Sequence, residues 1–159
     1  MSEPSLHHIA QITFDEAWTS ERSRDLAQER EVAISDLLVH NHFAPKGSPR
    51  GAYHLHLSVT ENRLVFDVDY ASGRKCGRFV LSLVPFTRKV KEYLMIVESY
   101  NAAIRDASRQ RIETLDMARR GLHDDGARLL TELLEDKVEI DFATARRLFT
   151  LICVLHMKG

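Results

Sequence analysis

Cysteine is scarce in this chain, long apolar runs are absent, and the net charge is close to zero. The two cysteines, Cys76 and Cys153, show no CxxC spacing, which excludes a disulfide framework and a zinc site built from cysteines. Such sparse use is typical of a reducing compartment, so we expect two free thiols. The longest apolar run, LFTLICVL at 148–155, is far shorter than the ~20 residues that span a bilayer. Because the N-terminal stretch is polar, unlike a signal peptide, we expect a cytoplasmic protein with no membrane partner.

The charge balance argues against another group of partners. Lys and Arg number 22 and Asp and Glu number 23, so the net charge of -1 supplies no broad positive field for nucleic acid. We therefore expect no nucleic-acid partner. The sequence also has no phosphate loop, dinucleotide fingerprint or nucleophile elbow, which excludes the enzyme classes that these motifs mark. No cofactor is predicted.

The size and composition of the chain fit one globular domain. Of its 159 residues, 44% are hydrophobic and 28% are charged, which is average for a soluble protein. A chain of this length buries about two-thirds of its unfolded surface in one core. Because it has no internal repeat and no linker, we predict a single domain over residues 1–159, with the first few residues flexible.

Periodicity predicts the secondary structure. Three runs with apolar residues at every second position, at 53–59, 64–70 and 79–83, predict an antiparallel β-meander with one apolar face. Helical spacing, with Ser108 as a cap and Gly121 as a break, predicts the helices. The other predicted elements are an edge strand at 8–14, helices at 24–40, 86–104, 108–120, 124–134 and 141–156, a loop at 43–51 and a short strand at 138–142.

The last predicted helix is apolar on every side. Such a helix is stable when it lies in the centre of the core or is shared with another subunit. We predict a homodimer that buries part of this C-terminal helix, and the alternative is that the remaining helices and the sheet enclose it within one chain. The apolar residues behind this prediction are Phe142, Leu148, Phe149, Leu151, Ile152, Val154 and Leu155.

Four segments carry a resemblance to a known family. ENRLVFDV at 61–68, LSLVPFTRKVKEYLMI at 81–96, RRGLHDDG at 119–126 and DFATARRLFTLICVLHMKG at 141–159 are similar to a bacterial family catalogued as uncharacterised protein family 0262. The resemblance runs from about Arg24 to the C-terminus. It implies no activity, cofactor or catalytic residue.

The predicted hairpin at 53–70 carries histidine and aspartate on its polar face. If Glu61 and Asn62 form a two-residue turn, the apolar residues of both strands share one side. That register sets two His and Asp pairs on the other side: His54 opposite Asp69 and His56 opposite Asp67. Four such groups can bind a metal ion or orient a histidine as a base. On a flat strand face a solvated surface is the better interpretation, so we predict no metal site.

RRGLHDDG at 119–126 is the stronger candidate for a site. If a helix ends at Gly121 and another begins at Asp124 or Asp125, the free amides of the second helix can bind an anion. The alternative is a glycine-terminated helix followed by an aspartate cap, without a ligand. The residues predicted to bind the anion are Arg119, Arg120, His123, Asp124 and Asp125.

Together these patterns predict an α+β fold, a small antiparallel β-meander packed against several α-helices with a buried C-terminal helix. The favoured function is a non-enzymatic binding or adaptor protein that self-associates. The alternative is a small enzyme or binding protein that acts on a phosphorylated or other anionic ligand at 119–126. Convergence of side chains on one cleft favours the alternative, and an exposed apolar patch favours the adaptor.

Overall fold

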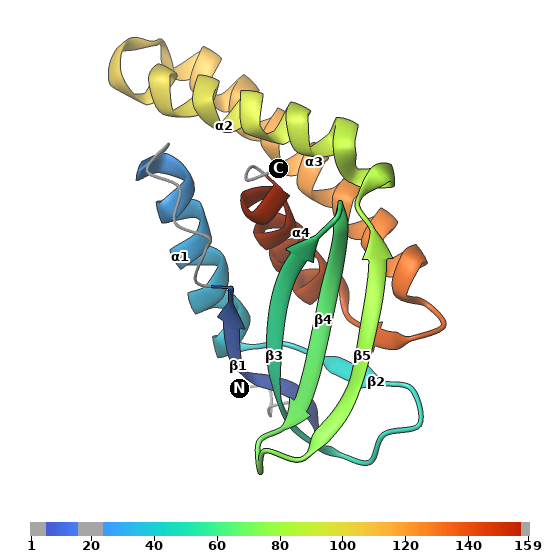
Figure 1. Ribbon diagram of the computed structural model, residues 1–159. Coiled ribbons are helices and arrows are strands. Elements are labelled where there is room, and N and C mark those ends of the chain that lie inside the picture. Colours follow the sequence, from blue (N-terminus) through green and yellow to red (C-terminus); the bar gives the residue numbers. More distant parts are fainter. Residues whose placement is uncertain (1–5, 16–23, 157–159) are drawn as a thin grey trace.

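A computed structural model of the chain describes residues 6–15 and 24–156 (Figure 1). The first few residues, which we expected to be flexible, lie outside this part. No helix in the described ranges has the length and apolarity needed to cross a lipid bilayer. The described elements, in chain order, are β1 (His7–Phe14), α1 (Arg24–Val39), β2 (Phe43–Pro45), β3 (Gly51–Thr60), β4 (Arg63–Tyr70), β5 (Lys75–Ser82), a 3-10 turn (Val84–Phe86), α2 (Thr87–Asp106), α3 (Arg109–Leu134), β6 (Val138–Ile140) and α4 (Phe142–His156).

The predicted α+β class and the β-meander are confirmed. Strands lie in the order β1-β3-β4-β5, and β3, β4 and β5 are antiparallel neighbours. Glu61 and Asn62 form the predicted turn with φ of 52° and 59°, as a two-residue hairpin requires. β1 is the predicted edge strand, but it pairs with β3 in parallel. The parallel pairing is possible because α1 and β2 lie between the two strands in the chain and carry it back across the sheet.

A second, two-stranded sheet joins β2 to β6. The strand predicted at 138–142 is therefore present, as Val138–Ile140. The loop predicted at 43–51 begins with a strand instead, because Phe43, Ala44 and Pro45 pair with residues 138–140. The two segments are far apart in the sequence, so no local pattern marks the pairing.

Helix α4 occupies the centre of the core. Its apolar residues from Leu148 to Leu155 are buried against α1, α3, α2 and β3 of the same chain (Figure 1). The alternative that we left open, enclosure within one chain, is the one that the structure shows. The apolar circumference of the helix is therefore no longer a reason for a homodimer, although Phe142, near its start, is 46% exposed.

Helix α3 runs unbroken from Arg109 to Leu134, which corrects the predicted break at Gly121. Ser108 caps it as predicted, since its hydroxyl accepts a hydrogen bond from the Arg111 amide at 3.3 Å. A glycine inside a helix costs about 1 kcal/mol relative to alanine, and the packing of the following turns against α4 outweighs that cost. The free amides expected near Asp124 and Asp125 are therefore absent, because both residues lie inside the helix.

Candidate functional site

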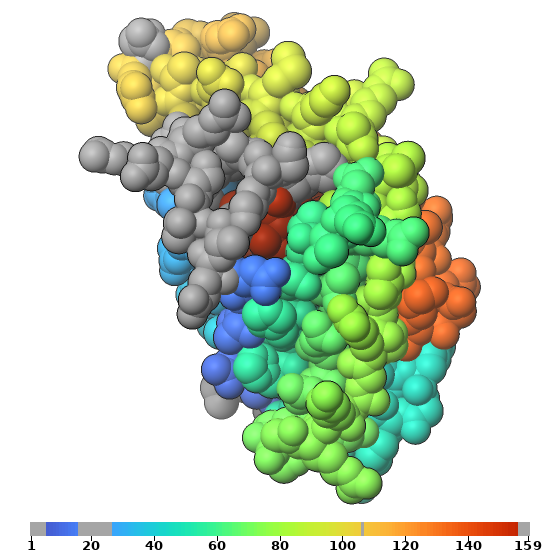
Figure 2. All heavy atoms as spheres, in the orientation of Figure 1, coloured from blue at the N-terminus to red at the C-terminus, as the bar shows by residue number. Residues whose placement is uncertain are grey.

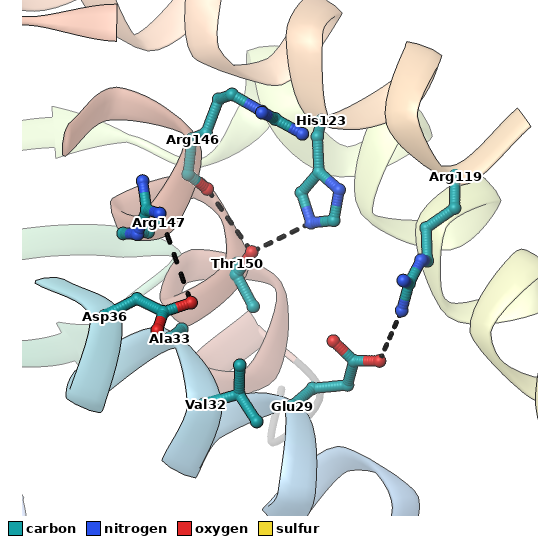
Figure 3. Close-up of a pocket in the computed structure, with 9 residues that line it drawn as sticks. All are labelled: Glu29, Val32, Ala33, Asp36, Arg119, His123, Arg146, Arg147 and Thr150. Carbon is teal, nitrogen blue, oxygen red and sulfur yellow. Dashed lines mark hydrogen bonds and ion pairs between the residues drawn. The ribbon is translucent and has the colours of Figure 1, made fainter. Parts of the chain in front are cut away.

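A cavity of about 190 Å³ lies among α1, α3 and α4 (Figure 3). Each helix contributes a different set of side chains. Carboxylates and small apolar groups come from α1, a guanidinium and an imidazole come from α3, and two guanidiniums and a hydroxyl come from α4. The lining residues are Glu29, Val32, Ala33 and Asp36 of α1, Arg119 and His123 of α3, and Arg146, Arg147 and Thr150 of α4.

The close approach of α3 to α4 sets the geometry of this cavity. Gly126 of α3 faces the ring of Phe149, and a Cβ at this position would lie 2.5 Å from Phe149 Cγ. The absence of a side chain at Gly126 therefore lets the helices touch. One turn before Gly126, His123 Nε2 lies 2.9 Å from Thr150 Oγ1 of α4, and its ring packs edge-on against Tyr93 at 5.0 Å between centroids.

The three arginines of the cavity all face carboxylates. Arg119 Nη1 lies 3.0 Å from Glu29 Oε1, which joins α3 to α1. Two further pairs connect the other helices: Arg146 Nε lies 3.3 Å from Asp124 Oδ1, and Arg147 Nη2 lies 4.0 Å from Asp36 Oδ2. The guanidinium of Arg119 also stacks over Tyr100, 4.7 Å from the ring centroid. The cavity wall is thus a network of ion pairs that fixes the positions of its cations.

These ion pairs leave three hydrogen-bond donors unused. The Nε–H groups of Arg119, Arg146 and Arg147 are buried, and none has a hydrogen-bond acceptor among the residues that the structure describes. For Arg146 the distance to Asp124 is short, but the direction is not that of a hydrogen bond. Buried donors are nearly always satisfied in folded proteins. Of the four buried Nε–H groups without an acceptor in the described residues, the three of Arg119, Arg146 and Arg147 belong to arginines that line this cavity, and the fourth, that of Arg30, lies outside it.

His123 is held in its neutral form. Burial, together with the positive charges of Arg146 and Arg119, lowers its pKa from 6.5 to about 4. Figure 3 shows Arg146 beside the imidazole and Thr150 below it. A neutral imidazole offers one donor and one acceptor, so it contributes hydrogen bonds to the cavity without adding a charge.

The carboxylate of Glu29 is fixed from two sides. Tyr93 donates its hydroxyl to Glu29 Oε2 at 3.1 Å while Arg119 donates to the other oxygen, Oε1. Burial and the neighbouring Glu29 charge raise the pKa of Tyr93 far above its usual value, so the phenol keeps its proton. Glu29 therefore belongs to the rigid wall of the cavity.

The structure separates the five residues that the sequence singled out. Arg119 and His123 line the cavity, and Asp124 lies behind it as the partner of Arg146. Arg120 and Asp125 point elsewhere. Arg120 pairs with Asp116 at 3.1 Å, and Asp125 pairs with Arg128 at 3.1 Å.

Sequence reasoning missed the α1 and α4 sides of the cavity. Arg146 and Arg147 are adjacent arginines at the start of an otherwise apolar helix, and this contrast was the available signal. No sequence signal marked Glu29 and Asp36, because acidic residues on the polar side of an amphipathic helix are common. The α4 hydroxyl, Thr150, is 5% exposed and is likewise one polar group within an apolar run.

The outer face of the sheet has the predicted register but different partners. His54 pairs with Asp69 across the strands and His56 with Asp67, as expected. The imidazoles nevertheless bond to β1: Thr13 Oγ1 lies 2.9 Å from His54 Nε2 and 2.7 Å from His56 Nδ1. His56 Nε2 also lies 3.0 Å from Asp15, directly after β1. In the described part of the chain, no group of three or more His, Cys, Asp or Glu side chains is arranged to hold a metal ion.

Fold and cavity together define a small α+β protein with a polar, arginine-lined cavity between three helices. The chain belongs to the uncharacterised protein family UPF0262, whose profile matches residues 6–158. It is 49% identical to a UPF0262 protein of Nitrobacter winogradskyi over 157 residues, covering 99% of this chain and 94% of the relative. It is 52% identical to one of Caulobacter vibrioides over 153 residues, covering 96% and 95%. No solved structure matches the chain.

Proposed function

We propose that this protein is a non-enzymatic binding protein whose ligand is a small anion, a carboxylate or phosphate group, held in the cavity among α1, α3 and α4. One observation carries the proposal: the three guanidiniums that line the cavity each have a buried Nε–H with no acceptor among the described residues. Carboxylate and phosphate oxygens are the acceptors that match a guanidinium best, because two of its donors can bind them side by side.

The charges of the cavity favour a ligand with few formal charges. Glu29 and Asp36 offset part of the positive charge of the arginines. A bound anion therefore gains more from hydrogen-bond geometry than from net attraction. The volume of about 190 Å³ restricts the ligand to a small molecule or to one anionic group of a larger one.

Binding is favoured over catalysis by the state of His123. A general base works best when its pKa lies near the operating pH. The pKa of His123, lowered to about 4, makes it a weak base, although it remains a good hydrogen-bond partner. We place this function in the cytoplasm, since two free thiols suit a reducing compartment. Self-association is not part of the proposal, because α4 is enclosed by its own chain.

Calorimetric titration with sodium sulfate and with sodium succinate tests the proposal, since neither probe changes its charge at neutral pH. We expect saturable binding that Arg146→Gln and Arg147→Gln each weaken by about tenfold or more, as the loss of a charge-assisted hydrogen bond predicts. The matched control is Arg128→Gln, an exposed arginine of the same helix as His123 that lies outside the cavity. Binding that both α4 variants leave unchanged would refute the proposal, and so would the lack of any saturable binding.

A further inference from the structure

A second cavity lies at one end of the four-stranded sheet, and none of the helices that form the first cavity lines it. It has a volume of about 610 Å³ and lies between the chain that leads from β2 into β3 and the turn that joins β4 to β5. Figure 1 shows both segments at the end of the sheet opposite α2 and α3. The lining residues are Pro49, Arg50, Gly51, Ala52, Tyr70, Ala71, Ser72, Arg74, Lys75 and Cys76.

The charge of this second cavity is unbalanced. Arg50, Arg74 and Lys75 line it, and its described lining includes no Asp or Glu. The arginines of the first cavity all form ion pairs, whereas none of the ion pairs among the described residues includes Arg50, Arg74 or Lys75. Three cations around one hollow reinforce one another, and an anion with more than one negative charge gains from all three.

Hydrogen bonds within the protein fix the loop at residues 48–49, which forms one side of the second cavity. Tyr53 donates its hydroxyl to the Pro49 carbonyl at 3.1 Å, and His7 Nδ1 lies 3.0 Å from the same hydroxyl. Because the single hydroxyl proton goes to Pro49, the imidazole donates to the tyrosine oxygen. Ser48 Oγ lies 3.3 Å from Cys76 Sγ, which ties the loop to β5. A fixed rim lowers the ordering cost of binding.

The turn on the other side is equally constrained. The Gly73 amide donates to the Tyr70 carbonyl at 2.8 Å, and the Tyr70 amide donates to the Arg74 carbonyl at 2.7 Å. Gly73 has a φ of 95°, a conformation that glycine adopts without strain. The turn therefore holds the backbone of Arg74 in place beside the cavity.

An aromatic ring completes the lining. Tyr70 packs on Tyr53 with 5.6 Å between centroids, and a Cβ at Gly51 would lie 3.5 Å from Tyr70 Cδ1. The small residues Gly51, Ala52 and Ala71 leave the neighbourhood of this ring open. A planar or apolar group can rest there while a charged group meets the cations.

We infer that this second cavity binds a phosphorylated small molecule, with its phosphate against Arg50, Arg74 and Lys75 and its planar or apolar part against Tyr70. The inference rests on the cavity, its three cations and its aromatic ring. It does not depend on the function proposed for the first cavity, since the two share no lining residue.

Cys76 provides a built-in reporter for this binding. It lines the second cavity and is partly exposed, whereas Cys153 is 0% exposed in the core. A thiol reagent should therefore modify Cys76 first, and a ligand above it should slow the reaction. Mass spectrometry of the native protein alkylated with iodoacetamide measures this rate, with unreacted Cys153 as proof that the fold is intact.

Phenyl phosphate, inorganic phosphate and benzoate are the probes, compared at equal ionic strength set with sodium chloride. We expect phenyl phosphate to slow alkylation of Cys76 with saturation, and to bind on the order of two- to tenfold more tightly than inorganic phosphate because of the ring contact. Benzoate, with one charge, should protect more weakly than phenyl phosphate. Equal protection by phenyl phosphate and by sodium chloride alone would overturn the inference.

Charge reversal separates a bound phosphate from general screening. Arg74→Glu and Lys75→Glu should each weaken protection by phenyl phosphate about tenfold or more. Arg63→Glu is the matched control, because Arg63 is an exposed cation at the opposite end of β4 and should leave protection unchanged. Protection that Arg74→Glu and Lys75→Glu retain, or that Arg63→Glu removes equally, would contradict the assigned site.

Discussion

Two glycines of α3 should respond to the same substitution with opposite signs. Gly121 is exposed and a Cβ there would meet nothing within 4 Å, whereas a Cβ at Gly126 would lie 2.5 Å from Phe149 Cγ. Alanine in place of glycine in a helix stabilises it by about 1 kcal/mol when nothing else changes. Gly121→Ala should therefore raise the free energy of unfolding by about 1 kcal/mol.

At Gly126 the same gain is exceeded by a steric cost. The Phe149 ring cannot move aside easily, since it is 0% exposed and packs against the rings of Phe86, Tyr93 and His123. Overpacking of this kind costs typically about 1–3 kcal/mol, and the short contact places Gly126→Ala near the upper end. After the helix gain of about 1 kcal/mol is subtracted, we expect a net loss of about 2 kcal/mol.

Urea unfolding followed by circular dichroism measures both changes in the free energy of unfolding, and thermal unfolding with the same signal measures the shifts in Tm. For a chain of this size a change of 1 kcal/mol shifts Tm by about 2–4 °C, so Gly126→Ala should lower Tm by about 4–8 °C and Gly121→Ala should raise it by about 2–4 °C. In a Phe149→Leu background, Gly126→Ala should lose most of its cost, because the ring that it meets is gone. A Gly126→Ala variant as stable as the parent would refute the close α3–α4 contact.

Two further predictions concern the charge state of the cavity and the state of assembly. The His123 pKa of about 4 in the folded chain lies below the value of 6.5 when unfolded, so stability should fall by up to about 3 kcal/mol as pH drops from 6.5 to 4. His123→Gln should remove that part of the pH dependence in urea unfolding, and identical pH profiles would contradict the assignment. Light scattering should give a mass near 18.2 kDa, the mass of one chain, because α4 is enclosed by its own chain. A mass of about twice that value would contradict this prediction and support a homodimer.

The parts of the fold that the sequence predicted are those with a local cause. Alternation of apolar residues and a two-residue turn at Glu61 and Asn62 fix the β3–β4 register, because a shift by one residue would move every apolar side chain to the wrong face. The pairings of β1 with β3 and of β2 with β6 join segments distant in the sequence, and no local pattern marks them. The sequence does not distinguish Gly121 from Gly126. The difference between them is the Phe149 ring, which lies against Gly126 and has no counterpart at Gly121.

The site was predictable on one helix and unpredictable across three. Arg119 and His123 stand one turn apart on α3 and share a face, whereas the sequence grouped them only as neighbours at a helix junction, because it predicted a break at Gly121. Their partners come from α1 and α4, and the packing angle of three helices, which brings Glu29 to Arg119 and Thr150 to His123, depends on the whole core. Hydrophobic periodicity shows which face of a helix is buried, but it does not show which residues that face contacts.

The composition of the first cavity is itself an argument for a ligand. Ion pairs contribute little to stability, because water screens the exposed ones and the cost of desolvation offsets most of the attraction in the buried ones. The helices α1, α3 and α4 nevertheless place three guanidiniums, two carboxylates, an imidazole and a hydroxyl around one small hollow beside an apolar core. Three of the guanidinium donors gain no acceptor from the described residues in return. The proposed small anion would supply acceptors to these donors, which is why the unused donors are the observation that supports it.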